Sequence, residues 1–395
     1  MHIGIVSVIS THSLSPYLHL SGDEPQGAGP SGATAPTLLA EELIKKGHTV
    51  SVFSLTTELE LGAEYTVRGD NLTIYFVGAR KRVRHRASDI YKYERRYLCN
   101  KILEIKPSVL NAHWQYEHAL AALDSKVPVL VTCRDSPVHV LRYLPNTYRL
   151  LRLLIAVYVV NKATYLSVTS NYLAKNIKRL SFNKKISIIP NFEPDWIFSL
   201  YKKEKIYSEI PKIVMINNGF QKRKNVEVGI RAFQIIRKQF PSSTLHLYGY
   251  HFEMNGPAYD WALSQNLLEN IIFHGLVNFK ELMNVLWHYN ILVHTAREET
   301  FGNILAEAMA QGIPVIGGDK SGAVPEVVGE NGKAGFLVDI NSEEKVAEAV
   351  LKIFSNEKVY NQFSKNAREE AIAKFKAADV VTAYEKIYNN LLNGI

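Results

Sequence analysis

The chain has only two cysteines among its 395 residues, Cys99 and Cys133, and they lie far apart in the sequence. This scarcity excludes a disulfide scaffold and is typical of a reducing compartment. Apolar runs are also short, since the longest, Leu150–Val160, is interrupted by Arg152 and cannot span a membrane. The first residues, MHIGIVSVIS, lack a basic segment and a cleavage site, so we expect a first strand there instead of a signal peptide. These features predict a cytoplasmic protein.

Two cofactor signatures are missing as well. The glycines after the first predicted strand do not have the spacing of the dinucleotide fingerprint, so no nicotinamide or flavin is expected. The chain also offers no dense group of aspartates of the kind that holds a catalytic divalent cation. We therefore predict no cofactor and a metal-independent reaction.

The positive charge is unevenly distributed. Residues 1–197 contain 24 Lys and Arg against 16 Asp and Glu, whereas residues 198–395 contain 22 of each. The strongest basic cluster is Arg80–Arg86, followed by Lys92, Arg95 and Arg96 and by three tyrosines, Tyr91, Tyr93 and Tyr97. This combination favours a membrane surface or an anionic acceptor, with a merely solvated face as the alternative. No nucleic-acid-binding motif accompanies the cluster, so nucleic acid is not an expected partner.

Alternating strand and helix patterns run through both halves of the chain. An apolar strand at 2–8, a Gly-rich loop, a helix at 37–46 and a strand at 49–53 form one βαβ unit. A strand at 212–216, a helix at 226–239 and a strand at 244–248 repeat this arrangement. Because the chain is long for one core, we predict two α/β domains, each a doubly wound parallel sheet.

The stretch REETFGNILAEAMAQGIPVI, residues 297–316, carries two glutamates at a fixed spacing. Glu299 lies in a loop that follows an apolar strand, and Glu307 lies eight positions later on a helix predicted at 303–310. The free amides at a helix start attract an anion or hydroxyls, and Gly302 allows close approach to the backbone. A loop carboxylate and a helix carboxylate on a solvated face are the alternative interpretation.

This stretch resembles the signature of family 4 of the retaining glycosyltransferases, which are two-domain enzymes that use nucleotide sugars. The matching features are Glu299-x7-Glu307, Phe-Gly after the first glutamate, Glu-Ala-Met-Ala at the second, and Gly-Ile-Pro-Val after the helix. The resemblance implies the GT-B fold, in which two Rossmann-like domains face a central cleft. It implies an acceptor-binding domain over 1–195, completed by a helix at about 378–395, and a nucleotide-sugar-binding domain over 196–377, with a linker near 192–210.

The resemblance also assigns roles to residues of the second domain. Glu299 accepts hydrogen bonds from the donor sugar, and Glu307 binds the ribose diol. Other residues expected along the donor are Phe301, Gly302, Asn303, Ile304, Gly219 and Leu276.

Three consecutive cations, Lys222, Arg223 and Lys224, precede the helix at 226–239, where they oppose the helix dipole. An anionic ligand favours cations at that position. The family carries an Arg and then a Lys here for the donor diphosphate. Lys224 matches the Lys, and Arg223 is the substitute candidate for the missing Arg.

In the first domain the resemblance points to the Gly-rich loop, with Gly29 and Gly32, and to His113 at a strand end. Many relatives have a His at the position of Arg134. An Arg there cannot act as a base but can hold a phosphate or carboxylate on the acceptor. Pairing of Arg134 with Asp135 is the alternative.

The resemblance implies a hexosyltransferase that moves a sugar from a nucleotide diphosphate, expected to be UDP, to a hydroxyl of a glycan or lipid-linked glycan in surface polysaccharide synthesis. Its expected location is the cytoplasm, at the inner face of a membrane. The alternatives are a catalytically silent nucleotide-sugar-binding partner of a transferase and a nucleotide-sugar epimerase on the same fold.

Overall fold

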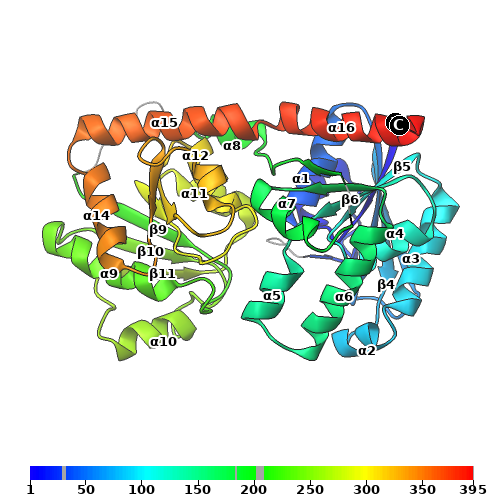
Figure 1. Ribbon diagram of the computed structural model, residues 1–395, viewed down its shortest axis with the longest axis horizontal. Coiled ribbons are helices and arrows are strands. Elements are labelled where there is room, and N and C mark those ends of the chain that lie inside the picture. The colour runs from blue at the N-terminus through cyan, green and yellow to red at the C-terminus, as the bar shows by residue number, and fades with distance from the viewer. Residues whose placement is uncertain (29–32, 183–184, 202–208, 395) are drawn as a thin grey trace. The chain divides into compact units, whose positions relative to one another are not determined.

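The computed structural model describes residues 1–28, 33–182, 185–201 and 209–394 (Figure 1). The chain divides into two compact units, Met1–Pro190 with Ala378–Ile395, and Asn191–Ala377. It therefore crosses between the units twice, at 190/191 and at 377/378. Helix α8 (Asp195–Ser199) buries Ile197 and Phe198 in the second unit, so this part of the predicted linker is a packed element. Residues 202–208 of that linker lie outside the described residues.

The first unit contains a sheet in the order β3-β4-β2-β1-β5-β6-β7-β8. Neighbouring strands are parallel except for β3, which runs antiparallel to β4 at one edge. The strands are β1 (His2–Val6), β2 (Thr49–Thr56), β3 (Glu64–Arg68), β4 (Leu72–Gly78), β5 (Val109–His113), β6 (Val129–Cys133), β7 (Tyr165–Val168) and β8 (Ile186–Ile188). Most of their residues are buried, as expected for parallel strands covered on both faces.

Helices cover both faces of this sheet. They are η1 (His12–Tyr17), α1 (Thr34–Lys45), α2 (Val83–Ser88), α3 (Lys92–Ile105), α4 (Glu117–Asp124), α5 (Pro137–Tyr143), α6 (Thr147–Lys162), α7 (Asn171–Lys178) and α16 (Ala377–Asn393). Leu110 and Ala112 of β5 pack in a core shared with α3, α4 and α6. Asn111 points to the opposite face, where its amide donates to Tyr388 of α16 at 2.8 Å. The last helix of the chain is thus part of the first unit.

The second unit contains a fully parallel sheet in the order β11-β10-β9-β12-β13-β14 among the residues described. Its strands are β9 (Lys212–Ile216), β10 (Thr244–Tyr248), β11 (Ile271–Gly275), β12 (Ile291–Val293), β13 (Val315–Gly318) and β14 (Gly335–Val338). Its helices besides α8 are α9 (Val226–Gln239), α10 (Pro257–Ser264), α11 (Phe279–Leu286), α12 (Asn303–Ala310), α13 (Val324–Val328), α14 (Glu343–Ile353) and α15 (Glu357–Phe375).

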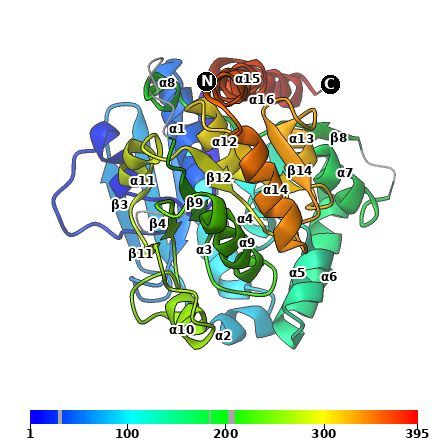
Figure 2. The ribbon, with the colours of Figure 1, turned by 90° about the vertical axis from the view of Figure 1, so that its left-hand side faces the viewer.

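Alternate residues of these strands enter two separate cores. Met215 and Leu247 pack with α9, α10 and α14 on one face, where α9 and α14 lie side by side (Figure 2). Val214 and Leu292 pack with α11, α12 and α13 on the other. Both units are therefore doubly wound sheets, as the sequence predicted.

Candidate active site

The predicted donor residues of the second unit follow three different strands of one parallel sheet. Gly219 follows β9, Leu276 follows β11 and Glu299 follows β12. Because the carboxyl ends of parallel strands share one edge, these positions lie along the same edge of the sheet, where α/β folds bind ligands. Gly219 has a φ of +100° and donates its N–H to the carbonyl of Tyr250 at 3.0 Å. Leu276 is 53% exposed, which leaves this end of the edge open.

Helix α12 begins at this edge in the way its sequence predicts, over residues 303–310. Gly302 starts it with φ 95° and ψ 61°, a left-handed conformation in which a Cβ would lie 3.1 Å from Leu305 Cδ1. No side chain caps the helix, so its first amides are left for a ligand. The Phe301 ring is buried edge-on against Phe375, with 5.5 Å between the ring centres. Only the backbone of Phe301 therefore remains for donor contacts.

The side chains after Gly302 have partners within the second unit. Asn303 Oδ1 accepts a hydrogen bond from Asn191 Nδ2 at 2.6 Å. Ile304 is partly buried against the core beneath α12. The backbone of Asn303 and Ile304, like that of Phe301, is therefore the part that remains for donor contacts.

An ion pair joins the loop after β12 to the loop after β9. Lys224 Nζ lies 2.5 Å from Glu299 Oε1, and His294 Nε2 lies 3.3 Å from the same oxygen. The loops are also joined through the backbone, since the Arg297 N–H donates to the Arg223 carbonyl at 2.8 Å. Burial disfavours the charged form of Glu299, but the charge of Lys224 and the nearby His294 side chain outweigh it and hold the Glu299 pKa well below its usual value. Glu299 is therefore a carboxylate at neutral pH.

Two of the three cations before α9 have carboxylate neighbours. Arg223 Nη1 donates to the Glu298 carbonyl at 3.0 Å and lies 3.6 Å from Glu298 Oε2, while Lys224 pairs with Glu299. Carboxylates of the enzyme itself therefore also favour cations at this position, because Glu298 and Glu299 offset their charge. A donor role for Arg223 and Lys224 stays a prediction.

Glu307 is buried, and its carboxyl acts electrostatically on a residue that the sequence pattern did not single out, Glu193. Glu307 is 6% exposed and Glu193 is 2% exposed, and their carboxyls are electrostatic neighbours. Burial raises the pKa of Glu307 to about 8, and burial together with Glu307 raises that of Glu193 well above its usual value. Glu193 follows the Pro190-Asn191 turn in an apolar context, and that context is the only signal for its burial.

A second feature missed from the sequence is Asn217, directly after β9. Its side chain is buried, and both its amide nitrogen and its amide oxygen lack a hydrogen-bond partner among the described residues. Unpaired buried amides are costly, so such a group at a ligand-binding edge points to a polar ligand. The available signal was the place of Asn217 beside Asn218 and Gly219, which occupy the region where the family has an Arg.

In the first unit, His113 and Arg134 come together at the ends of β5 and β6. Arg134 Nη2 lies 2.8 Å and Nε 3.1 Å from His113 Nδ1. Because the guanidinium donates to Nδ1, the imidazole proton lies on Nε2, which is buried without a partner in the described part of the chain. Burial, and then the charge of Arg134, lower the His113 pKa well below its usual value. His113 is therefore a neutral donor.

The helix α16 supports Arg134, since the Tyr384 hydroxyl is hydrogen-bonded to its guanidinium. Asp135 has its own donors, Gln115 Nε2 at 2.7 Å and the Tyr116 hydroxyl at 2.8 Å. The next residue after His113, Trp114, has a φ of +63°. A strained backbone at a strand end is typical of a binding site. The predicted loop residues Gly29 and Gly32 lie outside the described residues.

The basic cluster is only partly available for a partner. Arg80 is held by Asp89, at two distances of 2.8 Å, and by Glu94. Tyr91 is 1% exposed, so its predicted interfacial role is wrong: it packs in the core next to α3. The exposed cations, here called the basic surface, are Lys81, Arg82, Arg84, Lys92 and Arg96.

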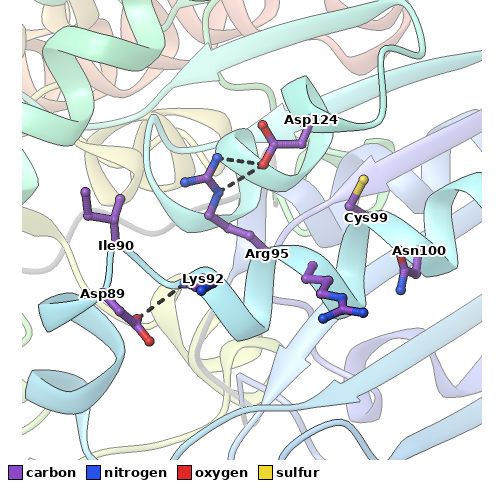
Figure 3. A pocket seen from close by; sticks show the side chains of 8 residues that line it. Asp89, Ile90, Lys92, Arg95, Cys99, Asn100 and Asp124 are labelled. Carbon is purple, nitrogen blue, oxygen red and sulfur yellow. Dashed lines mark hydrogen bonds and ion pairs between the residues drawn. The ribbon is translucent and has the colours of Figure 1, made fainter.

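A hollow of about 400 Å³ on α3 includes two residues of the basic surface, Lys92 and Arg96 (Figure 3). It is lined by Lys92, Arg95 and Arg96, together with Cys99 and Asp124. Arg95 donates to Asp124 from Nε at 3.0 Å and from Nη2 at 2.6 Å, so one of the three cations is already neutralised.

Within the described ranges, no group of three or more His, Cys, Asp or Glu side chains is arranged to hold a metal ion. The same part of the chain contains no helix that is both long and apolar enough to cross a membrane.

Two family descriptions match consecutive parts of the chain. Residues 34–192 match Glycosyltransferase Family 4, and residues 198–370 match Glycosyl transferases group 1. Together with the doubly wound units and the carboxylate-bearing edge, they define the class of protein. The chain belongs to family 4 of the retaining glycosyltransferases and is a glycosyltransferase.

Among individual relatives, N-acetyl-alpha-D-glucosaminyl L-malate synthase of Bacillus anthracis is 24% identical over 386 residues, 92% of this chain and 94% of its own. The capsular polysaccharide biosynthesis glycosyltransferase CapM of Staphylococcus aureus is 32% identical over 103 residues, 26% of this chain and 27% of its own.

Solved structures share the fold at low identity. Sucrose-phosphate synthase of Thermosynechococcus elongatus matches with a TM-score of 0.77 and 18% identity, over 100% of this chain and 99% of its own. HepE of Anabaena, solved with UDP-glucose, matches with a TM-score of 0.70 and 15% identity, over 99% of this chain and 100% of its own. The GT-B fold predicted from the sequence is confirmed.

Proposed function

We propose that this enzyme transfers a hexose from a UDP-sugar to a hydroxyl of a glycan or lipid-linked glycan in surface polysaccharide synthesis, with retention of the anomeric configuration. The observation that carries the donor half of the proposal is the Lys224–Glu299 ion pair at the ligand-binding edge, beside the uncapped start of α12. The UDP-glucose complex of HepE and the capsule role in the name of CapM support the choice of donor and of process.

The charges along this edge suit a nucleotide diphosphate as the leaving group. Lys224 and Arg223 face carboxylates in the free enzyme, and a bound diphosphate would share their positive charge as it gains negative charge. Glu299, ionised by these neighbours, accepts hydrogen bonds from the sugar hydroxyls. The amides of Phe301, Gly302 and Asn303 donate to the sugar or to the phosphate.

Retention follows if the acceptor approaches from the face that the diphosphate leaves. The bond from the anomeric carbon to the phosphate oxygen breaks, and the acceptor oxygen bonds to the same carbon. The acceptor's proton passes to an oxygen of the departing diphosphate, which serves as the base. Glu299 is committed to Lys224, so it is a poor candidate for a covalent nucleophile.

We assign the acceptor contacts to His113 and Arg134 in the first unit. His113 offers a buried neutral N–H at Nε2, which fits a hydroxyl or a phosphate oxygen. Arg134 offers a guanidinium that is held in place by Tyr384 and fits an anionic group. An acceptor that carries a phosphate or carboxylate is consistent with both side chains.

We also place the enzyme at the cytoplasmic face of an anionic membrane. The basic surface supplies five exposed cations. Helix α6, which packs on α2, exposes Leu150 (49%), Leu154 (59%) and Tyr158 (51%) at four-residue intervals. Apolar side chains along one helix face beside cations are typical of interfacial helices. No role for nucleic acid is proposed.

The direct test is incubation of the enzyme with a panel of UDP-sugars in the absence of acceptor, followed by NMR of the released sugar. We expect slow hydrolysis of one donor with the anomeric configuration retained at first release, and loss of that hydrolysis in Lys224→Ala. Release of the inverted anomer, or no hydrolysis of any nucleotide sugar, contradicts the proposal.

A further inference from the structure

The segment that brings the chain into the second unit is fixed against the helix that carries Glu307. The N–H of Glu193 donates to the carbonyl of Phe375 at 2.8 Å, and Glu193 forms a parallel bridge with Lys376. Two residues earlier, Asn191 is hydrogen-bonded to Asn303 at the start of α12. The backbone around Glu193 is thereby held between the start of α12 and the end of α15.

The side chain of Glu193 is directed into this packed region and not to solvent. Glu193 is 2% exposed, and its Oε2 has no hydrogen-bond donor in the part of the chain that the structure describes. Its electrostatic neighbour is the carboxyl of Glu307, which is 6% exposed. A buried carboxyl without a donor is costly, and a second carboxyl beside it increases the cost of ionisation.

No described cation acts on either carboxyl to relieve this cost. Helices α8, α13 and α15 and strand β13 pack against α12. On α15, Arg368 donates to the carbonyls of Phe198 and Ala310, and Lys374 pairs with Glu370 and donates to the carbonyl of Glu326. The other charged groups nearby are Asp195 of α8 and Lys376, both exposed, and Glu326 of α13, which is half-buried; β13 has none. Protonation of the carboxyls of Glu193 and Glu307 must therefore relieve the cost of burying them together.

We propose that Glu193 is a positioning residue for the donor nucleotide. It stays protonated and donates a hydrogen bond to Glu307, so that Glu307 ionises when the ribose hydroxyls bind. This inference rests on the proposed function, because it takes Glu307 as the ribose contact. The ribose hydroxyls donate to the carboxylate of Glu307, and the Glu193 hydroxyl donates to it from the protein side. Both hydrogen bonds favour the ionised form, so nucleotide binding releases a proton.

The two carboxyls divide these tasks because their surroundings differ. Glu193 is the more deeply buried, and burial, together with the neighbouring carboxyl of Glu307, raises its pKa well above the usual value. Burial raises the pKa of Glu307 to about 8, so a modest stabilisation by ligand hydroxyls ionises it near neutral pH. A hydrogen bond to a charged group contributes about tenfold or more in binding.

The test is calorimetry with UDP in two buffers of different ionisation enthalpy, which counts the protons released. A pH near the Glu307 pKa of about 8 suits it, because the diphosphate itself is then fully ionised. The proteins are the wild type, Glu193→Gln, Glu193→Leu and Glu307→Gln, with Glu330→Gln as an exposed control in the same unit.

We expect the wild type to release a fraction of a proton, and Glu193→Gln, which keeps a donor, to match it in affinity and proton release. Glu193→Leu should bind UDP about tenfold more weakly and release a larger fraction of a proton, because Glu307 then ionises without a hydrogen bond from residue 193. Glu307→Gln should release none, and the control should behave as wild type. Thermal unfolding of each variant separates these effects from loss of folding.

The inference is overturned if Glu193→Leu binds and releases protons as the wild type does, or if Glu307→Gln leaves the proton count unchanged. In either case UDP binding that depends on Lys224 would leave the proposed function intact. If the wild type binds no nucleotide at all, both the inference and the proposed function fail.

Discussion

Lys224 Nζ lies 2.5 Å from Glu299 Oε1, although 75 positions separate the two residues in the chain. The pair joins the loops after β9 and β12, which are neighbouring strands of the second sheet. Its side chains are largely buried, with 11% of Lys224 and 16% of Glu299 exposed. A cation held ready by a carboxylate at a ligand-binding edge can transfer part of its interaction to an incoming diphosphate.

Lys224→Ala should lower the rate of sugar transfer or donor hydrolysis by about a hundredfold, because a group that stabilises the departing diphosphate is lost. Initial rates at saturating donor measure the effect. Lys345→Ala removes an exposed lysine of the same unit and is the control. A rate within twofold of wild type for Lys224→Ala would show that the diphosphate is neutralised elsewhere.

Gly302→Ala should destabilise the second unit by about 1–2 kcal/mol, because alanine resists the left-handed conformation and its Cβ would press on Leu305. Gly302→Asn should cost less, since asparagine tolerates this region. Thermal or urea unfolding measures both. Equal stability of Gly302→Ala and wild type would mean that α12 does not need this conformation to start.

The Glu193–Glu307 pair should make the second unit less stable as the pH rises. In the unfolded chain both carboxyls ionise near pH 4.5, whereas in the folded state the pKa of Glu307 is about 8 and that of Glu193 is well above its usual value. The folded state thus binds more protons between these values, so its stability is greatest below pH 4.5 and falls as the pH rises through this window.

Glu193→Gln removes one of these groups and should flatten that dependence between pH 5 and pH 8. Melting temperatures of wild type and variant across that range give the comparison. Parallel curves would mean that Glu193 is ionised, or exposed, in the folded protein.

The basic surface should give salt-sensitive binding to anionic vesicles and none to neutral ones. Substitution of Arg82 and Arg84 by serine should weaken sedimentation with phosphatidylglycerol vesicles by about 2 kcal/mol, since each cation near such a surface contributes about 1 kcal/mol. Lys345→Ser with Lys352→Ser makes the same change in net charge on the second unit and should have no effect. Equal loss in both double variants would mean that only net charge matters.

Local patterns carried much of the fold and part of the site. The helix at 303–310 and the strands at 212–216 and 244–248 have the predicted bounds, because glycine, apolar periodicity and β-branched runs act over short distances. Lys224 and Glu299 were both singled out because they match the family's motif residues. That they bind each other could not be read from the sequence, because it depends on β9 and β12 being neighbours in the sheet.

The residues that the sequence interpretation missed are set by tertiary packing. Glu193 and Asn217 are ordinary polar residues beside turns, and only their burial without partners marks them out. Tyr91 was misread for the same reason: a tyrosine among arginines looks interfacial, yet it begins α3 in a left-handed conformation and packs in the core.

The measurement that tests the account most directly is calorimetry of uridine, guanosine and adenosine diphosphate sugars against wild type, Lys224→Ala and Glu307→Ala. The account predicts that one donor, a UDP-sugar, binds to the wild type and that both variants bind it at least about tenfold more weakly. Wild-type affinity in both variants, or no binding of any nucleotide sugar, would contradict the assignment of this edge as the donor site.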